Sequence, residues 1–130
     1  EEHWDDWLPV GLPDAKNRAY RGKQMPVFGI DTPDKIKEME EILAQADYII
    51  FTSNRGYGAI PHLPEKFPYM IQFYQDLFAG KRGFTKIKEF TSYPTLNLGV
   101  MKFVFPDDAA DESFTVYDHP KVIIFKKNVP

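Results

Sequence analysis

The chain has 130 residues, a formal net charge of −3 and no cysteine. This length fits one domain that can bury roughly two thirds of its unfolded surface, and the missing cysteine excludes disulfides and thiolate or cysteine–zinc chemistry. Charged residues of both signs are interspersed without a basic stripe, so nucleic acid is not an expected partner.

The start of the chain predicts a fragment of a longer protein. It opens with Glu1-Glu2 and shows no signal peptide. No apolar run approaches the roughly 20 residues that a membrane-spanning helix needs. Residues 9–26, with three prolines and two glycines, are loop-like.

The first regular elements are expected after residue 26. Residues 27–30 (V-F-G-I) are typical of a short strand. D-T-P-D at 31–34 then has the composition of a helix start, with capping residues, a proline for the first turn and an acid at the positive end of the helix dipole. Apolar residues at helical spacing predict an amphipathic helix over about 33–45.

The middle of the chain predicts a second strand and a second helix. Residues 47–52 (D-Y-I-I-F-T) form a nearly unbroken apolar run, as in a strand buried on both faces. The polar, glycine-rich stretch S-N-R-G-Y-G follows at 53–58. A helix is predicted over about 68–79, with Gly80 as its natural stop.

The last third predicts mostly strands. One is expected over 84–91 and another over about 98–105, followed by an acidic loop. The tail, 114–126, is predicted as two strands joined by a D-H-P turn. This order indicates an α/β fold, which we expect to be a three-layer, Rossmann-like mixed sheet of about five or six strands with two main helices and a C-terminal antiparallel hairpin.

The stretch S-N-R-G-Y-G is the first candidate site. Ligands of open α/β sheets bind at the carboxyl ends of strands, where this stretch would lie. Ser53 and Asn54 offer hydrogen bonds, Arg55 a fork that fits phosphate or carboxylate, and Tyr57 a ring for a sugar face. The alternative is a structural turn with Arg55 paired to a nearby acid. The stretch is neither a P-loop nor a G-x-G-x-x-G fingerprint.

Metal binding is not expected. His3, His62 and His119 are scattered without metal-ligand spacing. Asp5 and Asp6 would point to opposite faces of an extended segment and could not easily chelate together. The acidic loop P-D-D-A-A-D-E lacks the spacing and the glycine of a calcium-binding EF-hand.

Catalysis is not expected either. Ser53, Asp118 and His119 can be combined into a hydrolase triad only on paper, because no G-x-S-x-G elbow is present. D-H-P at 118–120 is better explained as a turn that Asp118 and Pro120 stabilise. We therefore predict no catalytic residue, no metal and no cofactor in this chain.

Longer stretches of the chain resemble one group of proteins. They are A-D-Y-I-I-F-T-S-N-R-G-Y-G-A-I-P-H-L-P-E-K-F-P (46–68), Y-Q-D-L-F-A-G-K-R-G-F (74–84), F-T-S-Y-P (90–94) and E-S-F-T-V-Y-D-H-P-K-V-I-I-F-K (112–126), with the opening E-H-W-D-D-W-L-P. In this order they resemble parts of bacterial multi-spanning membrane glycosyltransferases of the dolichyl-phosphate-mannose–protein mannosyltransferase type. The resemblance covers most of the chain.

The resemblance implies a soluble domain on the extracytoplasmic face of the membrane, attached to the membrane helices of its parent chain. Such proteins use a lipid-phosphate-linked sugar, and their catalytic acid lies in a loop that these residues do not contain. The expected function is thus a non-catalytic accessory domain that contacts saccharide or polyprenyl-phosphate-sugar. The alternative is a carbohydrate- or anion-binding module without a transferase. An independent enzyme is the least supported class.

W-D-D-W would then mark the end of a first strand, beside the S-N-R stretch, where an aspartate–Arg55 pair could brace the fold or hold a sugar hydroxyl. The predicted binding rim comprises Asp5, Asp6, Ser53, Asn54, Arg55, Tyr57, His62, Asp118 and His119. Convergence of these residues in one pocket would favour a binding module. Separate roles in turns and caps would favour a scaffold.

Overall fold

The computed structural model describes residues 22–93, 95–99, 101–104 and 121–129. Its elements, in chain order, are α1 (Pro33–Gln45), β1 (Tyr48–Phe51), the π-helical turn η2 (Arg55–Ala59), the 3₁₀ turn η3 (Ile60–His62), α2 (Pro68–Phe78), β2 (Phe84–Phe90), β3 (Thr95–Leu98), β4 (Met101–Val104) and β5 (Val122–Lys127). Both predicted helices are confirmed, as are the strands predicted at 47–52 and 84–91.

The main sheet has three strands in the order β1-β5-β2, and both pairings are antiparallel. The β1–α2–β2 segment does make two strands that run in the same direction, but β5 lies between them. The expected Rossmann-like parallel sheet is therefore not seen in the described part of the chain. β5 pairs with β1 on one side and β2 on the other, and residues 114–120 of the predicted C-terminal hairpin lie outside the described residues.

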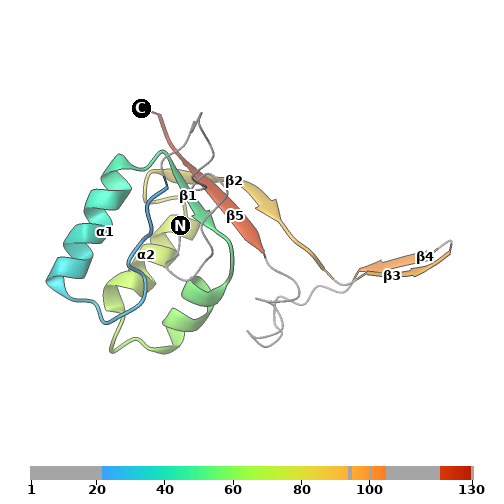
Figure 1. The fold of residues 1–130 in the computed structure, drawn as a ribbon, viewed down its shortest axis with the longest axis horizontal. Coiled ribbons are helices and arrows are strands. Elements are labelled where there is room, and N and C mark those ends of the chain that lie inside the picture. The colour runs from blue at the N-terminus through green and yellow to red at the C-terminus, as the bar shows by residue number, and fades with distance from the viewer. Residues whose placement is uncertain (1–21, 94, 100, 105–120, 130) are drawn as a thin grey trace, which may run out of the picture.

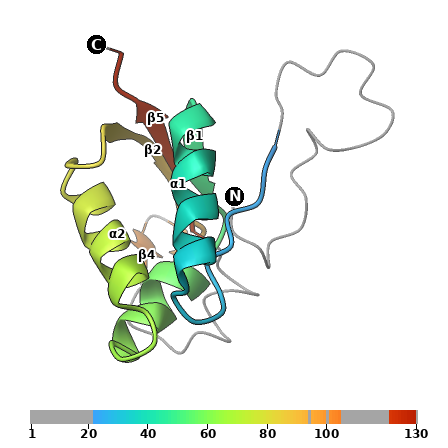
Figure 2. The ribbon, with the colours of Figure 1, turned by 90° about the vertical axis from the view of Figure 1, so that its left-hand side faces the viewer.

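α1 and α2 lie on one face of this sheet (Figures 1 and 2), so the described elements form two layers rather than three. Strand side chains alternate between the two faces. Ile49 and Phe51 of β1 and Ile123 and Phe125 of β5 are buried, whereas Tyr48 is 42% exposed. Among the described strands, β1 is thus an edge strand buried on one face, not the doubly buried strand that its apolar sequence predicts.

The predicted strand at 27–30 is wrong, for a clear physical reason. This segment is an irregular loop that bends at Phe28–Gly29, where Gly29 has a φ of +88°. Among the described residues, no strand pairs with this segment. Instead, the Lys35 ammonium donates to the Val27 carbonyl at 3.0 Å and to the Gly29 carbonyl at 2.6 Å.

Lys35 and Asp31 together form a buried ion pair that we call the Asp31–Lys35 clasp. Nζ of Lys35 lies 2.8 Å from Oδ1 of Asp31, and the two side chains are only 8% and 2% exposed. The other oxygen, Oδ2, accepts the backbone N–H of Met70 at 3.0 Å, in the first turn of α2. Asp31 thereby caps a helix to which it does not belong, since α2 has no side-chain cap of its own.

The other ends of the helices follow standard capping chemistry. Thr32 accepts the backbone N–H of Lys35 and caps α1. After α2, Gly80 has a φ of +72°, its N–H bonds the Leu77 carbonyl, and the N–H of Lys81 bonds the Asp76 carbonyl. This is the Schellman motif, and it confirms Gly80 as the predicted stop.

A second polar cluster joins the helices at the surface. Oε1 of Glu40, on α1, accepts the Tyr69 hydroxyl at 2.7 Å and two Arg82 nitrogens at 3.0 and 3.1 Å. The Arg82 guanidinium also lies over the rings of Tyr69 and Phe73, at 5.7 and 5.4 Å from their centroids. This cluster therefore ties α1, α2 and the turn after α2 together.

The strand predicted over about 98–105 overlaps two strands of a hairpin: Leu98 ends β3, and β4 covers Met101–Val104. β3 and β4 pair antiparallel around a turn at Gly99, whose φ is +69°. Gly99, whose conformation suits a tight turn, therefore separates two strands where the sequence predicts one. The hairpin projects away from the helices and the main sheet (Figure 1).

We expect Asp31→Ala to lower the free energy of unfolding by about 3–5 kcal/mol, because it leaves the Lys35 ammonium buried without its partner and removes the cap of α2. Asp34→Ala, which removes an exposed acid from the same turn, should cost only about 0.5 kcal/mol. Urea unfolding followed by circular dichroism measures both. Equal effects of the two substitutions would mean that the clasp contributes little.

The Tyr69 cluster predicts an alkaline dependence of stability. Burial, followed by the hydrogen bond from Tyr69 to the Glu40 carboxylate, raises the pKa of Tyr69 well above its usual value, although Arg82 opposes this. A raised pKa means that the stabilisation is complete below about pH 10 and is lost as the pH rises above it. Unfolding free energies between about pH 9 and 11 should fall more steeply for the wild type than for Tyr69→Phe. Tyr48→Phe, on β1, should follow the wild type.

Candidate functional site

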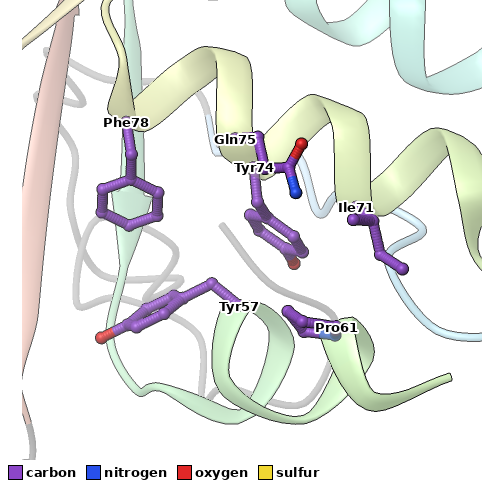
Figure 3. Close-up of a pocket in the computed structure, with 6 residues that line it drawn as sticks. All are labelled: Tyr57, Pro61, Ile71, Tyr74, Gln75 and Phe78. Atoms are coloured by element: carbon purple, nitrogen blue, oxygen red, sulfur yellow. The ribbon is translucent and has the colours of Figure 1, made fainter. Parts of the chain in front are cut away.

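A groove of about 390 Å³ opens between α2 and the η2–η3 segment (Figure 3). Its lining is mostly apolar, and the described lining residues are Tyr57, Pro61, Ile71, Tyr74, Gln75 and Phe78. This volume is near the lower end of the roughly 300–1,000 Å³ typical of small-molecule sites. The groove is thus large enough for a small ligand.

One wall of the groove is a single face of α2. Ile71, Tyr74, Gln75 and Phe78 stand at positions i, i+3, i+4 and i+7, which bring side chains together along a helix. Tyr74 is nearly buried and anchors this face to the core, whereas Phe78 is 44% exposed and Gln75 is exposed. The groove therefore has a firm apolar base and a solvent-facing rim.

The opposite wall comes from the segment that follows β1. Ser53 is buried, and its hydroxyl accepts the backbone N–H of Arg55 at 3.4 Å. Gly58 donates to the Asn54 carbonyl at 2.7 Å, which winds the chain into η2, and η3 follows. This winding brings Tyr57 and Pro61 opposite the Tyr74 and Phe78 rings (Figure 3).

Tyr57 is held by a network of rings. Its centroid lies 5.7 Å from that of Phe51, 6.3 Å from that of Tyr74 and 5.3 Å from that of Phe78. The last two contacts are edge-on, at 70° and 65°, which is a favourable geometry for aromatic pairs. Phe51 belongs to the sheet core, so the groove wall is continuous with the core.

The predicted rim is only partly within the described residues. Asp5, Asp6, Asp118 and His119 lie outside them, and so does the proposed pairing of an aspartate with Arg55. Tyr57 lines the groove, whereas Ser53 and Asn54 support the turn that carries it. Arg55 starts that turn and His62 ends η3 at the surface, and neither lines the groove.

The premise that placed a site at a parallel strand end does not apply, because β1 pairs antiparallel with β5. Of the six described lining residues, only Tyr57 was predicted from the sequence, and the other five were not. The 71/74/75/78 spacing was a visible signal, because it places one stripe of side chains along the helix predicted over about 68–79. Gln75, a polar residue within that stripe, was the feature that could have indicated a solvent-facing groove.

Other kinds of site find little support in the described part of the chain. No group of three or more His, Cys, Asp or Glu side chains there is placed to hold a metal ion. Neither α1 nor α2, the long helices among these residues, has the length and apolarity to cross a bilayer. The groove is therefore the best candidate site that the described residues offer.

Comparison of the chain with protein-family models, with curated protein sequences and with solved structures found no match. Function is therefore inferred from the chemistry of the groove, together with the resemblance of the sequence motifs.

The structure predicts that the glycine at 58 is not needed for an unusual backbone conformation. Its φ is not positive, and a Cβ there would meet Asn54 at an ordinary 3.8 Å. Gly58→Ala should leave the free energy of unfolding within about 0.5 kcal/mol of the wild type or raise it slightly. Gly80→Ala, at a positive φ, should cost about 1 kcal/mol. Thermal unfolding of both variants would show whether η2 is helical; a larger loss at Gly58 would contradict this.

Proposed function

We propose that this chain is a non-catalytic domain that contacts a saccharide through the groove, as the extracytoplasmic accessory part of a membrane glycosyltransferase-like protein. The observation that carries the saccharide contact is the combination, in one groove, of aromatic rings from Tyr57, Tyr74 and Phe78 with the Gln75 amide. The membrane association rests on the motif resemblance alone.

The groove chemistry matches the two-sided character of a sugar ring. A pyranose has faces rich in C–H groups, which pack on aromatic rings, and a rim of hydroxyls, which need hydrogen-bonding partners. Gln75 supplies both donors and an acceptor at the edge of the apolar surface. Few polar groups within a mostly apolar lining are typical of small-molecule sites.

The same lining is better suited to binding a sugar than to catalysing its transfer. The described lining residues include no carboxylate and no imidazole, the groups that usually transfer protons in glycosyl chemistry. In this proposal the domain holds or guides a sugar-containing substrate, and the reaction takes place in another part of the parent protein.

Ligand-observed NMR tests the saccharide contact. The full chain is titrated with methyl glycosides of glucose, galactose, mannose and N-acetylglucosamine. We expect saturation transfer to at least one of them, with a dissociation constant on the order of 1 mM, as is usual for a shallow site with few hydrogen bonds. If neither these neutral sugars nor the matching sugar phosphates showed saturation transfer, the proposed function would be contradicted.

Two matched pairs of variants locate the contact. Gln75→Ala and Phe78→Ala should each weaken binding about tenfold, because they remove the amide or an exposed ring from the rim of the groove. Gln72→Ala, an exposed position on α2 outside the groove, and Phe90→Ala, a half-exposed ring on β2, should leave it unchanged. Equal losses in both pairs would place the contact elsewhere.

A further inference from the structure

We infer that the groove takes an uncharged saccharide of one or two rings, and that the phosphate of a lipid-linked or nucleotide-linked sugar stays outside it. This inference rests on the proposed saccharide contact and narrows its ligand class. It decides between two ligand types, saccharide and polyprenyl-phosphate-sugar, that the motif resemblance leaves open.

The first reason to expect an uncharged ligand is the lack of charge in the described lining. The six described lining residues are all uncharged. An anion buried against them would lose its hydration without gaining a charge partner, which is strongly unfavourable. The nearest acid along α2 is Asp76, directly after Gln75 and half-buried, and it would repel a phosphate. Arg55 begins the turn that carries Tyr57, but it is not part of the lining.

The second reason, which favours a sugar over a flat aromatic ligand, is the geometry of the aromatic rings in the groove. A flat aromatic ligand such as a nucleobase is best held between two parallel rings with a gap between them. Here Tyr57 contacts Tyr74 and Phe78 directly and stands at 70° and 65° to them, so the three rings leave no slot. They form instead a stepped apolar surface, in which the exposed Phe78 ring and the partly exposed Tyr57 ring can carry one C–H face of a puckered pyranose beside the buried Tyr74.

The volume of the groove and the position of its amide limit how many sugar rings it can hold. A volume of about 390 Å³ is small for a ligand site, so a long glycan would extend beyond the groove. Gln75 is the lining residue with an amide, and it stands at the exposed rim next to the buried Tyr74. One or two sugar rings can therefore lie on the aromatic surface while their hydroxyls reach Gln75 and water.

The test pairs neutral and charged forms of the same sugar. The full chain is titrated with methyl α-D-mannoside and mannose 1-phosphate, with methyl α-D-glucoside and glucose 1-phosphate, and with the disaccharide maltose. Protein amide NMR spectra are recorded for the wild type, for Gln75→Lys and for the control Gln72→Lys. We expect a neutral sugar to bind at least tenfold more tightly than its phosphate. Gln75→Lys should raise phosphate binding at least fivefold, and Gln72→Lys should not.

The outcomes separate the inference from the proposed function. Wild-type binding of a sugar phosphate that equals or exceeds binding of its neutral form would overturn the inference and leave the saccharide contact standing. Equal gains of phosphate binding in both lysine variants would also overturn it, because the added charge would then act from anywhere on α2. No binding of any sugar would remove the proposed function itself. The amide spectra show in each case whether the variant is folded.

Discussion

The described fold depends on one buried ion pair. Lys35 reaches back from α1 to satisfy two carbonyls of the loop before it, and Asp31 holds that ammonium while capping α2. One carboxylate thus joins a loop and both helices, and each of its oxygens has a separate task. Burying a charge pair is costly, and it is tolerated only where every remaining donor and acceptor is satisfied, as it is here. Since α2 carries most of the groove, the position of the candidate site follows from this pair.

The groove shows how a core residue can also shape a surface. Tyr57 and the buried Tyr74 both contact Phe51, a fully buried residue of β1, so the aromatic wall of the groove is braced by the sheet. A site on such a support needs little reorganisation when a ligand arrives, which limits the entropy lost on binding. Phe78 extends the same network to Phe125 of β5, with centroids 5.4 Å apart. The central strand therefore contributes to the site without lining it.

The sequence allowed the helices to be predicted because their signals are local: the D-T-P-D start, the apolar spacing and Gly80 all lie within or beside the helix that they define. The sheet order could not be predicted in this way, since β1 and β2 find their partner β5 far along the chain. The loop at 27–30 was mistaken for a strand because its carbonyls are satisfied by a side chain, Lys35, that no β-pattern reveals. Tyr57 was identified from its own motif, but Pro61 and the face of α2 opposite it come together only in the folded chain.

The position of β5 has a consequence for how the protein is made. β5 is the central strand, yet it follows all the other described elements in the sequence. During synthesis, β1 and β2 emerge before the strand that lies between them. Until β5 follows, their backbone N–H and C=O groups must be hydrogen-bonded to water or covered by a chaperone. The helices can form locally at that stage. The sheet, and with it the rigid support of the groove, can close only after residues 122–127 leave the ribosome, so a nascent chain shorter than this would expose its apolar core face.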